Sequence, residues 1–198
     1  GSGVARSWNR MDPWDKMIRE PCKGQMAGFG EQKEKKKSQR LNTSQSGGEA
    51  LYKEAVNFHM QGDIKNAENL YRQAIKTGLL HEAIFSNLGV ICKNSGRPKE
   101  AIALYKKAIE INPNEPNSHA NLGNLLKELG NLDQALAATL KSLELKPNNP
   151  DAYYNLGCIY TELGNLDQAL ASTLKSLELK PDNPTAHMNL GGIYKELG

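Results

Sequence analysis

The tripeptide Asn-Leu-Gly returns every 34 residues along this chain, at residues 87–89, 121–123, 155–157 and 189–191. Single residue types keep the same interval, with alanine at Ala101, Ala135 and Ala169 and proline at Pro113, Pro147 and Pro181. A fixed period of this length predicts a stack of repeated helical hairpins rather than one closed globule. The sequence therefore predicts an all-α array, and we expect its function to be binding.

Within one period, apolar residues recur at the three-four spacing of an amphipathic helix. One set is Leu122, Leu125, Leu126 and Leu129, and a second set is Leu132, Leu136, Leu140 and Leu143. This spacing predicts two helices, each with an apolar face. Gly130 stands between the two sets, where a chain that must turn favours a residue without penalty at positive φ.

Start and stop signals agree with the two-helix pattern. Asn131 and Gln134, followed 34 residues later by Asn165 and Gln168, resemble a capping box at the start of each second helix. Pro147 and Pro181 follow the second helices as stops, whereas proline at 116, 150 and 184 suits the first turn of the next helix. We expect helix pairs that begin and end in register with the repeat.

The segment 150–183 resembles the tetratricopeptide repeat, a helix-turn-helix unit of about 34 residues. The matching residues are Tyr153, Leu156, Gly157 and Tyr160 on the first helix and Ala169 and Pro181 on the second. Thr173 and Ser176 depart from it, because the family usually has a larger aromatic residue and an alanine there. The resemblance implies a right-handed α-solenoid.

In this register the array spans residues 48–198. It divides into hairpins at 48–81, 82–115, 116–149 and 150–183, followed by a partial repeat at 184–198. The first hairpin is the most divergent, with Glu54 in place of leucine, as expected of a terminal cap. The last helix lacks a second helix to cover Tyr194 and Leu197, so we expect a fragment of a longer protein that self-associates through this uncapped end.

Residues 1–47 differ in composition from the array. They hold ten basic and five acidic residues, so they carry a charge of +5, and the remainder of the +3 chain carries −2. The sequence predicts a basic, disordered leader, in which residues 1–25 are foreign or upstream sequence before a start at Met26. The run 35–37 of lysines is not interleaved with aromatic residues, which argues against nucleic-acid binding.

Composition limits the remaining function classes. No apolar run approaches the length of a membrane span, and no apolar stretch near the N-terminus forms a signal peptide, so we expect a cytoplasmic protein that does not bind membranes. Cys22, Cys92 and Cys158 are odd in number and widely spaced, which argues against disulfides.

Motifs for catalysis, metals or cofactors are absent from the sequence. It lacks a glycine-rich phosphate loop, a nucleophile elbow and paired cysteines at metal spacing. His119 and His187 occupy the place of Tyr153 and Phe85, where we expect packing between helices rather than metal binding. We therefore expect no enzymatic activity, no cofactor and no metal.

The resemblance also implies a binding surface. In the family, the second, fifth, sixth, ninth, twelfth and thirteenth repeat positions line the concave side of the superhelix. The sixth position here is Asn87, Asn121, Asn155 and Asn189. A column of carboxamides can hold the backbone of an extended peptide, and this column resembles the asparagine ladder of O-linked N-acetylglucosamine transferases. The alternative is that each asparagine bonds its neighbours.

Neighbouring positions of this surface add other chemistry. The predicted groove residues are Tyr154 and Met188 as apolar contacts, Lys93, Lys127 and Lys195 as cations, and Asn124. Glutamates at 128, 162 and 196 balance the lysines, so no preference for an acidic or a basic ligand is expected. The basic residues with which chaperone-binding relatives hold a terminal carboxylate are replaced by Tyr52, Ser86, Ala120, Asn87 and Asn121, which disfavours that role.

These observations predict a protein-interaction scaffold that binds an extended peptide or a partner protein in the groove of the superhelix. An alternative reading stays open, because the chain resembles bacterial tetratricopeptide arrays that precede a glycosyltransferase or sulfotransferase domain. In that case the array would be the substrate-recognition arm of a larger enzyme.

Overall fold

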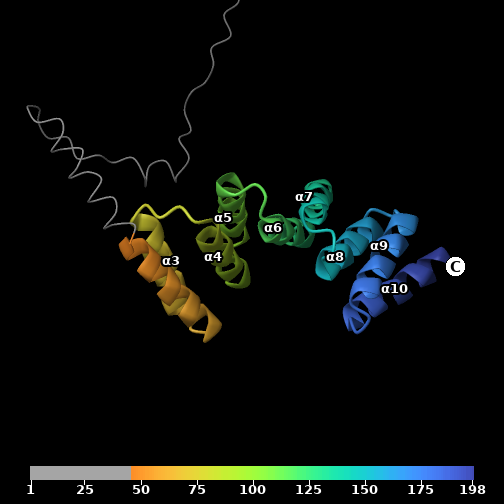
Figure 1. Cartoon of the computed structure of the whole chain (residues 1–198). Coiled ribbons are helices and arrows are strands. Elements are labelled where there is room, and N and C mark those ends of the chain that lie inside the picture. Colours follow the sequence, from red (N-terminus) through yellow and green to blue (C-terminus); the bar gives the residue numbers. More distant parts are fainter. Residues whose placement is uncertain (1–45) are drawn as a thin grey trace, which may run out of the picture. The chain divides into compact units, whose positions relative to one another are not determined.

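The computed structural model describes residues 46–198, and all regular secondary structure in this part of the chain is helical. The predicted leader and the start at Met26 fall almost entirely outside the described residues. The first described helix covers 46–60. It is followed by α3 (Ile64–Lys76), α4 (Glu82–Asn94), α5 (Pro98–Ile111), α6 (Pro116–Glu128), α7 (Leu132–Leu145), α8 (Pro150–Glu162), α9 (Leu166–Leu179) and α10 (Pro184–Leu197). The described chain is an all-α repeat solenoid (Figure 1).

Proline and glycine mark the helix ends as the sequence predicts. Pro116, Pro150 and Pro184 each stand in the first turn of a helix. Gly130 and Gly164, with φ of 74° and 75°, turn the chain from α6 to α7 and from α8 to α9. The capping-box prediction is wrong in its hydrogen bond, because Asn131 is the N-cap of α7 but its side chain bonds no backbone amide there.

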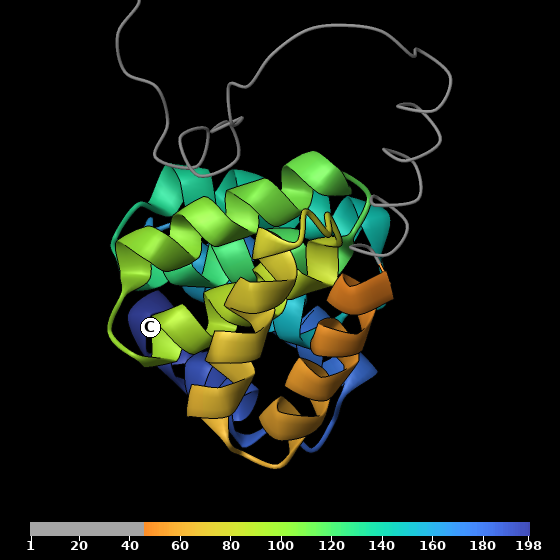
Figure 2. The same ribbon diagram turned by 90° about the vertical axis from the view of Figure 1, so that its left-hand side faces the viewer.

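The described chain divides into two compact units, one that ends at Leu79 and one that spans Leu80–Gly198. In the described part of the first unit, the 46–60 helix and α3 lie side by side (Figure 2). Tyr71 is fully buried and joins them, because its ring lies 6.3 Å from that of Tyr52 and its hydroxyl lies 3.3 Å from Nδ1 of His59. One buried aromatic residue thus organises this hairpin.

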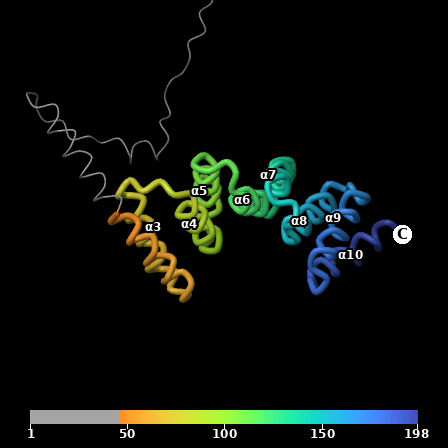
Figure 3. The backbone as a smooth tube through the Cα atoms, viewed as in Figure 1, coloured from red at the N-terminus to blue at the C-terminus, as the bar shows by residue number. Residues whose placement is uncertain are grey.

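The second unit contains three hairpins, α4 with α5, α6 with α7 and α8 with α9. Each second helix also contacts the first helix of the next hairpin, so α5 packs on α6, α7 on α8 and α9 on α10. Figure 3 follows the chain through this alternation. The first helices α4, α6, α8 and α10 begin 34 residues apart, at residues 82, 116, 150 and 184.

In the second unit the two helices of a hairpin lie in close contact at the glycine of Asn-Leu-Gly. A Cβ atom at Gly123 would lie 2.5 Å from the Thr139 hydroxyl and 3.2 Å from the Ala135 carbonyl. At Gly89 it would lie 2.6 Å from the Tyr105 ring. The glycine is therefore required by helix packing and not by backbone conformation, since these residues lie inside helices.

Small residues form most of the buried face of α7 and α9. The buried residues of α7 are Ala135, Thr139, Ser142 and Leu143, whereas α5 buries the larger Leu104 and Tyr105. Leu140, predicted on the apolar face, is 44% exposed, and Leu129 at the end of α6 is 43% exposed. The prediction of burial was wrong at these two leucines. Between hairpins, Leu143 packs with Ala152 and Leu156 of α8.

A substitution of Gly123 by alanine is expected to destabilise the protein, whereas the same change at Gly191 is expected to stabilise it. Alanine at 123 meets Thr139 and the α7 backbone, at an overpacking cost of about 1–3 kcal/mol. Alanine at 191 meets no atom within 4 Å and should gain about 0.5–1 kcal/mol of helix stability. Urea unfolding midpoints of G123A and G191A measure the difference, and equal midpoints would contradict it.

Candidate functional site

A pocket of about 270 Å³ lies between the first helices α6 and α8. Five asparagines, two alanines and one residue of each charge line it: Asn117, Ala120, Asn121, Asn124, Lys146, Asn149, Asp151, Ala152 and Asn155. Carboxamides offer both donors and acceptors, so this lining can pair with the N–H and C=O groups of a peptide backbone. We call this site the α6–α8 pocket.

The pocket exists because a small residue occupies the fifth position of α6. That position is Ala120 in α6, but it is Tyr154 in α8 and Met188 in α10. A tyrosine or methionine side chain at 120 would occupy volume that the alanine leaves open. Only one of these three first helices therefore combines the sixth-position asparagine with an alanine beside it.

The predicted asparagine column does not make one uniform set of hydrogen bonds. Asn121 Nδ2 lies 3.4 Å from the Ser86 hydroxyl on α4. Asn155 Oδ1 accepts a hydrogen bond of 3.1 Å from Lys127 Nζ on α6. Asn189 Nδ2 donates to the Thr173 hydroxyl of α9 at 3.0 Å. Asn87 is half-buried on α4, and only Asn121 and Asn155 of the column line the pocket.

Lys127 and Tyr154 meet next to this pocket. The ammonium of Lys127 lies 5.8 Å from the centroid of the Tyr154 ring, within the range of a cation–π interaction. Burial raises the pKa of Tyr154, and the neighbouring Cys158 thiol adds to the effect. The phenol therefore stays neutral at physiological pH, so its ring attracts the lysine while adding no charge.

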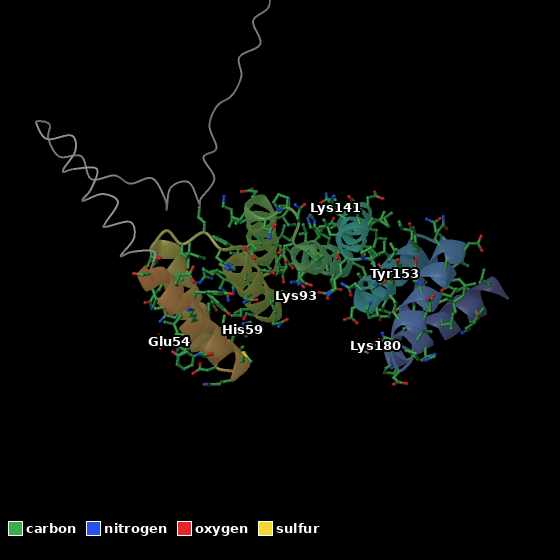
Figure 4. The ribbon with its side chains drawn as sticks, in the orientation of Figure 1. Glu54, His59, Lys93, Lys141, Tyr153 and Lys180 are labelled. Carbon is green, nitrogen blue, oxygen red and sulfur yellow. The ribbon has the colours of Figure 1, made fainter. Side chains whose placement is uncertain are left out.

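The other predicted groove residues differ in their surroundings. Lys93 on α4 forms a 2.7 Å salt bridge with Glu128 of α6, and Asn124 Nδ2 donates to the same carboxylate at 3.1 Å (Figure 4). Met188 is 78% exposed on α10, and Lys195 is exposed on the same helix. The structure thus brings Asn121, Asn124, Asn155, Lys127 and Tyr154 together, and leaves Met188 and Lys195 apart from the α6–α8 pocket.

The expected packing of two histidines is wrong. His119 Nε2 lies 2.9 Å from the Pro113 carbonyl, and His187 Nε2 lies 2.8 Å from the Pro181 carbonyl. Each imidazole thus bonds the turn that precedes its own helix instead of filling the space between helices. The sequence feature that could have predicted these bonds is a proline six residues before each histidine.

Among residues 46–198, no group of three His, Cys, Asp or Glu side chains could hold a metal ion. Within the same range, no helix combines the length and apolar character needed to cross a bilayer. Cys92 is buried and Cys158 is half-buried. The cytoplasmic location stays a prediction.

Four tetratricopeptide repeat family models match the chain. One described as "TPR repeat" matches residues 89–130 and 157–198, and three described as "Tetratricopeptide repeat" match 138–171, 116–149 and 49–77. The chain is a tetratricopeptide repeat protein. Repeats of this family are in general protein-interaction scaffolds.

Several solved structures share the fold of this chain. YrrB, described as a TPR protein with an unusual peptide-binding site, is 27% identical, with a TM-score of 0.64, covering 71% of this chain and 73% of its own. PilF of Pseudomonas aeruginosa is 21% identical, with a TM-score of 0.68, covering 79% and 70%. The first TPR of Spaghetti (RPAP3), bound to the HSP90 peptide SRMEEVD, is 24% identical, with a TM-score of 0.58, covering 59% and 92%.

No curated protein sequence matches this tetratricopeptide repeat protein. The alternative that the array serves as the recognition arm of a glycosyltransferase or sulfotransferase therefore stays a prediction. Self-association through α10 also stays a prediction. The side chains on which it depends are exposed, Tyr194 at 53% and Leu197 at 46%.

Several pocket residues were not among the predicted site residues, namely Asn117, Ala120, Lys146, Asn149, Asp151 and Ala152. Asn117 and Asp151 occupy the second repeat position and Ala120 the fifth, so the family pattern already pointed to these three. Asn149 is hidden by a second role, because its side chain caps α8 through the Ala152 amide at 3.3 Å. Lys146 lies beyond the first helices, at the C-cap of α7.

Thr139 and Thr173 occupy equivalent places on α7 and α9 but should respond differently to replacement by valine. The Thr139 hydroxyl is buried and has no hydrogen-bond partner among the described residues, whereas that of Thr173 accepts from Asn189. T139V should therefore be neutral or stabilising, and T173V should cost about 1 kcal/mol. Valine keeps the β-branched shape in both variants. Equal losses in urea unfolding would contradict this assignment.

Proposed function

We propose that this protein binds an extended segment of a partner protein along its first helices. The carboxamides of Asn121 and Asn155 pair with the ligand backbone, and one ligand side chain enters the α6–α8 pocket. The observation that carries the proposal is the pocket itself, whose lining is dominated by carboxamides and opened by Ala120. This is the lining expected for backbone recognition with little demand on sequence.

The hydrogen bonds of the asparagines are compatible with this role. In residues 46–198, Asn121 and Asn155 each use one side-chain atom, Nδ2 in Asn121 and Oδ1 in Asn155. A carboxamide has two donors and an acceptor with two lone pairs, so both residues retain capacity for a ligand. Bonding to neighbours and bonding to a peptide are therefore not exclusive, because the first can hold the amide in place for the second.

Comparison with solved structures supports a peptide as the ligand class. YrrB, 27% identical, is described as having an unusual peptide-binding site. The Spaghetti (RPAP3) repeat, which shares the fold, is described with a peptide bound. No comparable support points to catalysis, so binding is the function that this site favours.

Replacing Ala120 with tyrosine should abolish peptide binding by filling the α6–α8 pocket. Tyrosine occurs naturally at this repeat position in Tyr154, so the helix should tolerate it. Peptides are first selected on the wild-type protein from a random dodecapeptide display library, and their Kd values are measured by fluorescence anisotropy. We expect A120Y to weaken binding at least about tenfold, which corresponds to about 1.4 kcal/mol.

The matched control for this experiment is Ala137 to tyrosine. Ala137 is exposed on α7 and does not line the pocket. A137Y adds the same side chain to the surface and should leave the Kd unchanged. If A120Y binds the selected peptides as tightly as A137Y, the pocket is not the binding site.

A double substitution of Asn121 and Asn155 by alanine should weaken the same peptides, by about fivefold, because it removes two backbone-pairing groups. Helicity and melting temperature should change little, since both side chains are only half-buried. Asn69 to alanine, at an exposed position of α3, is the control and should leave the Kd unchanged. An unaltered Kd in the double variant would show that the asparagines serve only their neighbours.

A further inference from the structure

Two asparagines in the same Asn-Leu-Gly context point to different partners. Asn189 Nδ2 donates to Thr173 Oγ1, between α9 and α10. The equivalent bond from Asn155 to Thr139 is missing, and the Thr139 hydroxyl is buried without a partner among the described residues. Asn155 instead accepts from Lys127 at 3.1 Å. Asn155 therefore bonds Lys127, and the buried hydroxyl of Thr139 has no hydrogen-bond partner among the described residues.

The residue at the twelfth repeat position accounts for this difference. On α6 it is Lys127, whose ammonium reaches Asn155 of the next first helix. On α8 it is Thr161, whose hydroxyl bonds the Gly157 carbonyl of its own helix at 3.0 Å and offers nothing to Asn189. Lys127 therefore engages the following asparagine, whereas Lys93 at this position is paired with Glu128 and leaves Asn121 to bond Ser86.

Lys127 differs from Lys93, the lysine at the same repeat position on α4, because no carboxylate among the described residues neutralises it. Among the described residues its contacts are Asn155 Oδ1 and the Tyr154 ring, both uncharged. Lys93, at the same repeat position on α4, is paired with Glu128 at 2.7 Å. A half-buried ammonium with only neutral partners keeps an unmet preference for an anion.

Lys127 also lies at the edge of the α6–α8 pocket, because Asn155 both lines that pocket and accepts its hydrogen bond. The pocket lining itself carries one lysine, Lys146, and one aspartate, Asp151, so its formal charges cancel. Lys127 adds one positive charge beside the pocket, next to Asn155. A ligand in the pocket therefore lies close to this cation.

We propose that Lys127, Tyr154 and Asn155 form a subsite for a carboxylate side chain of the bound peptide. This proposal rests on the proposed function and specifies the ligand: an extended segment with an aspartate or glutamate beside the residue that enters the α6–α8 pocket. The carboxylate accepts a hydrogen bond from Lys127 Nζ, while Asn155 and the Tyr154 ring hold the ammonium in place. Asn155 acts as a positioning residue.

An internal side chain fits this place better than a chain terminus. The subsite lies between α6 and α8, with α4 before them and α10 after them in the same unit. Sixth-position asparagines stand on those outer helices too, at Asn87 and Asn189. An extended segment can therefore continue past Lys127 in both directions.

The test uses four pools of N-acetylated dodecapeptides with degenerate flanks. Three are C-amidated with a fixed central glutamate, glutamine or lysine, and the fourth has a central glutamine and a free C-terminal carboxylate. Retention on the immobilised full chain is measured for the wild type, K127T and K127R. We expect about tenfold greater retention of the glutamate pool over the glutamine pool by the wild type, kept in K127R and lost in K127T. The preference should also decline with added salt.

Lys141 to threonine is the matched control. Lys141 lies on α7, bonds Glu144 at 2.9 Å and does not line the pocket, yet its replacement changes the net charge by the same amount (Figure 4). K141T should retain the full preference for glutamate. If K141T and K127T lose this preference equally, the preference arises from net charge alone. That result would overturn the subsite.

The remaining outcomes separate the two proposals. In one outcome the wild type retains the glutamate and glutamine pools equally while A120Y retains neither. This result would overturn the carboxylate subsite and leave the peptide-binding function intact. If the wild type retains the pool with a free C-terminus most strongly, the subsite binds a terminal carboxylate and not a side chain. That result would overturn the proposal. If the wild type retains no pool, both proposals fail.

Discussion

The close contact at the glycine of Asn-Leu-Gly, between the two helices of the α4–α5, α6–α7 and α8–α9 hairpins, is the constraint on which the rest of the second unit depends. At Gly123 and Gly157 this contact is made with Thr139 and Thr173, which project from the second helix into the space that a side chain would occupy. Thr173 also reaches the next first helix through its hydrogen bond with Asn189. One threonine thus links two successive repeats, so the glycine that admits it fixes the spacing between them.

This contact also determines which chemistry is left for the binding surface. In α7 and α9 the residue that meets the glycine is a threonine, whose hydroxyl can accept a hydrogen bond from the sixth-position asparagine of the next first helix. The asparagine can then bond inward to the threonine, as Asn189 does, or toward the lysine of the preceding helix, as Asn155 does. Identical tripeptides acquire different roles through a neighbour 28 residues earlier in the chain.

Much of the fold could be predicted from the sequence because the signals repeat. Proline at the first helical turn and glycine at positive φ are local effects, so Pro116 and Gly130 appear where the pattern placed them. The prediction failed where tertiary packing decided, as at Leu140, which fits an apolar stripe in the sequence yet is 44% exposed. It failed again at His119, whose ring bonds the Pro113 carbonyl.

The candidate site was predictable only in part, for a similar reason. Asn121, Asn124 and Asn155 follow from repeat position alone, and all three line the pocket. The pocket itself depends on the small side chain of Ala120. A small residue in a sequence does not indicate a pocket until the positions of the neighbouring helices are known. Asn149 was masked by its capping bond, and the missing counter-charge of Lys127 could be seen only with Glu128 placed against Lys93.

The sequence differences between two hairpins are concentrated in their first helices. The second helices α7 and α9 are LDQALAATLKSLEL and LDQALASTLKSLEL, which differ only at Ala138 and Ser172. The first helices α6 and α8, PNSHANLGNLLKE and PDAYYNLGCIYTE, differ at most positions and share the first proline, the Asn-Leu-Gly tripeptide and the last glutamate. Of the shared residues, the glycine is the one that the contact between helices requires.

The differing residues include Ala120 against Tyr154 and Lys127 against Thr161, which lie at or beside the pocket. Between these two hairpins the second helix is nearly constant and the first helix varies. Under the proposed function, the two hairpins would therefore present different surfaces to an extended ligand.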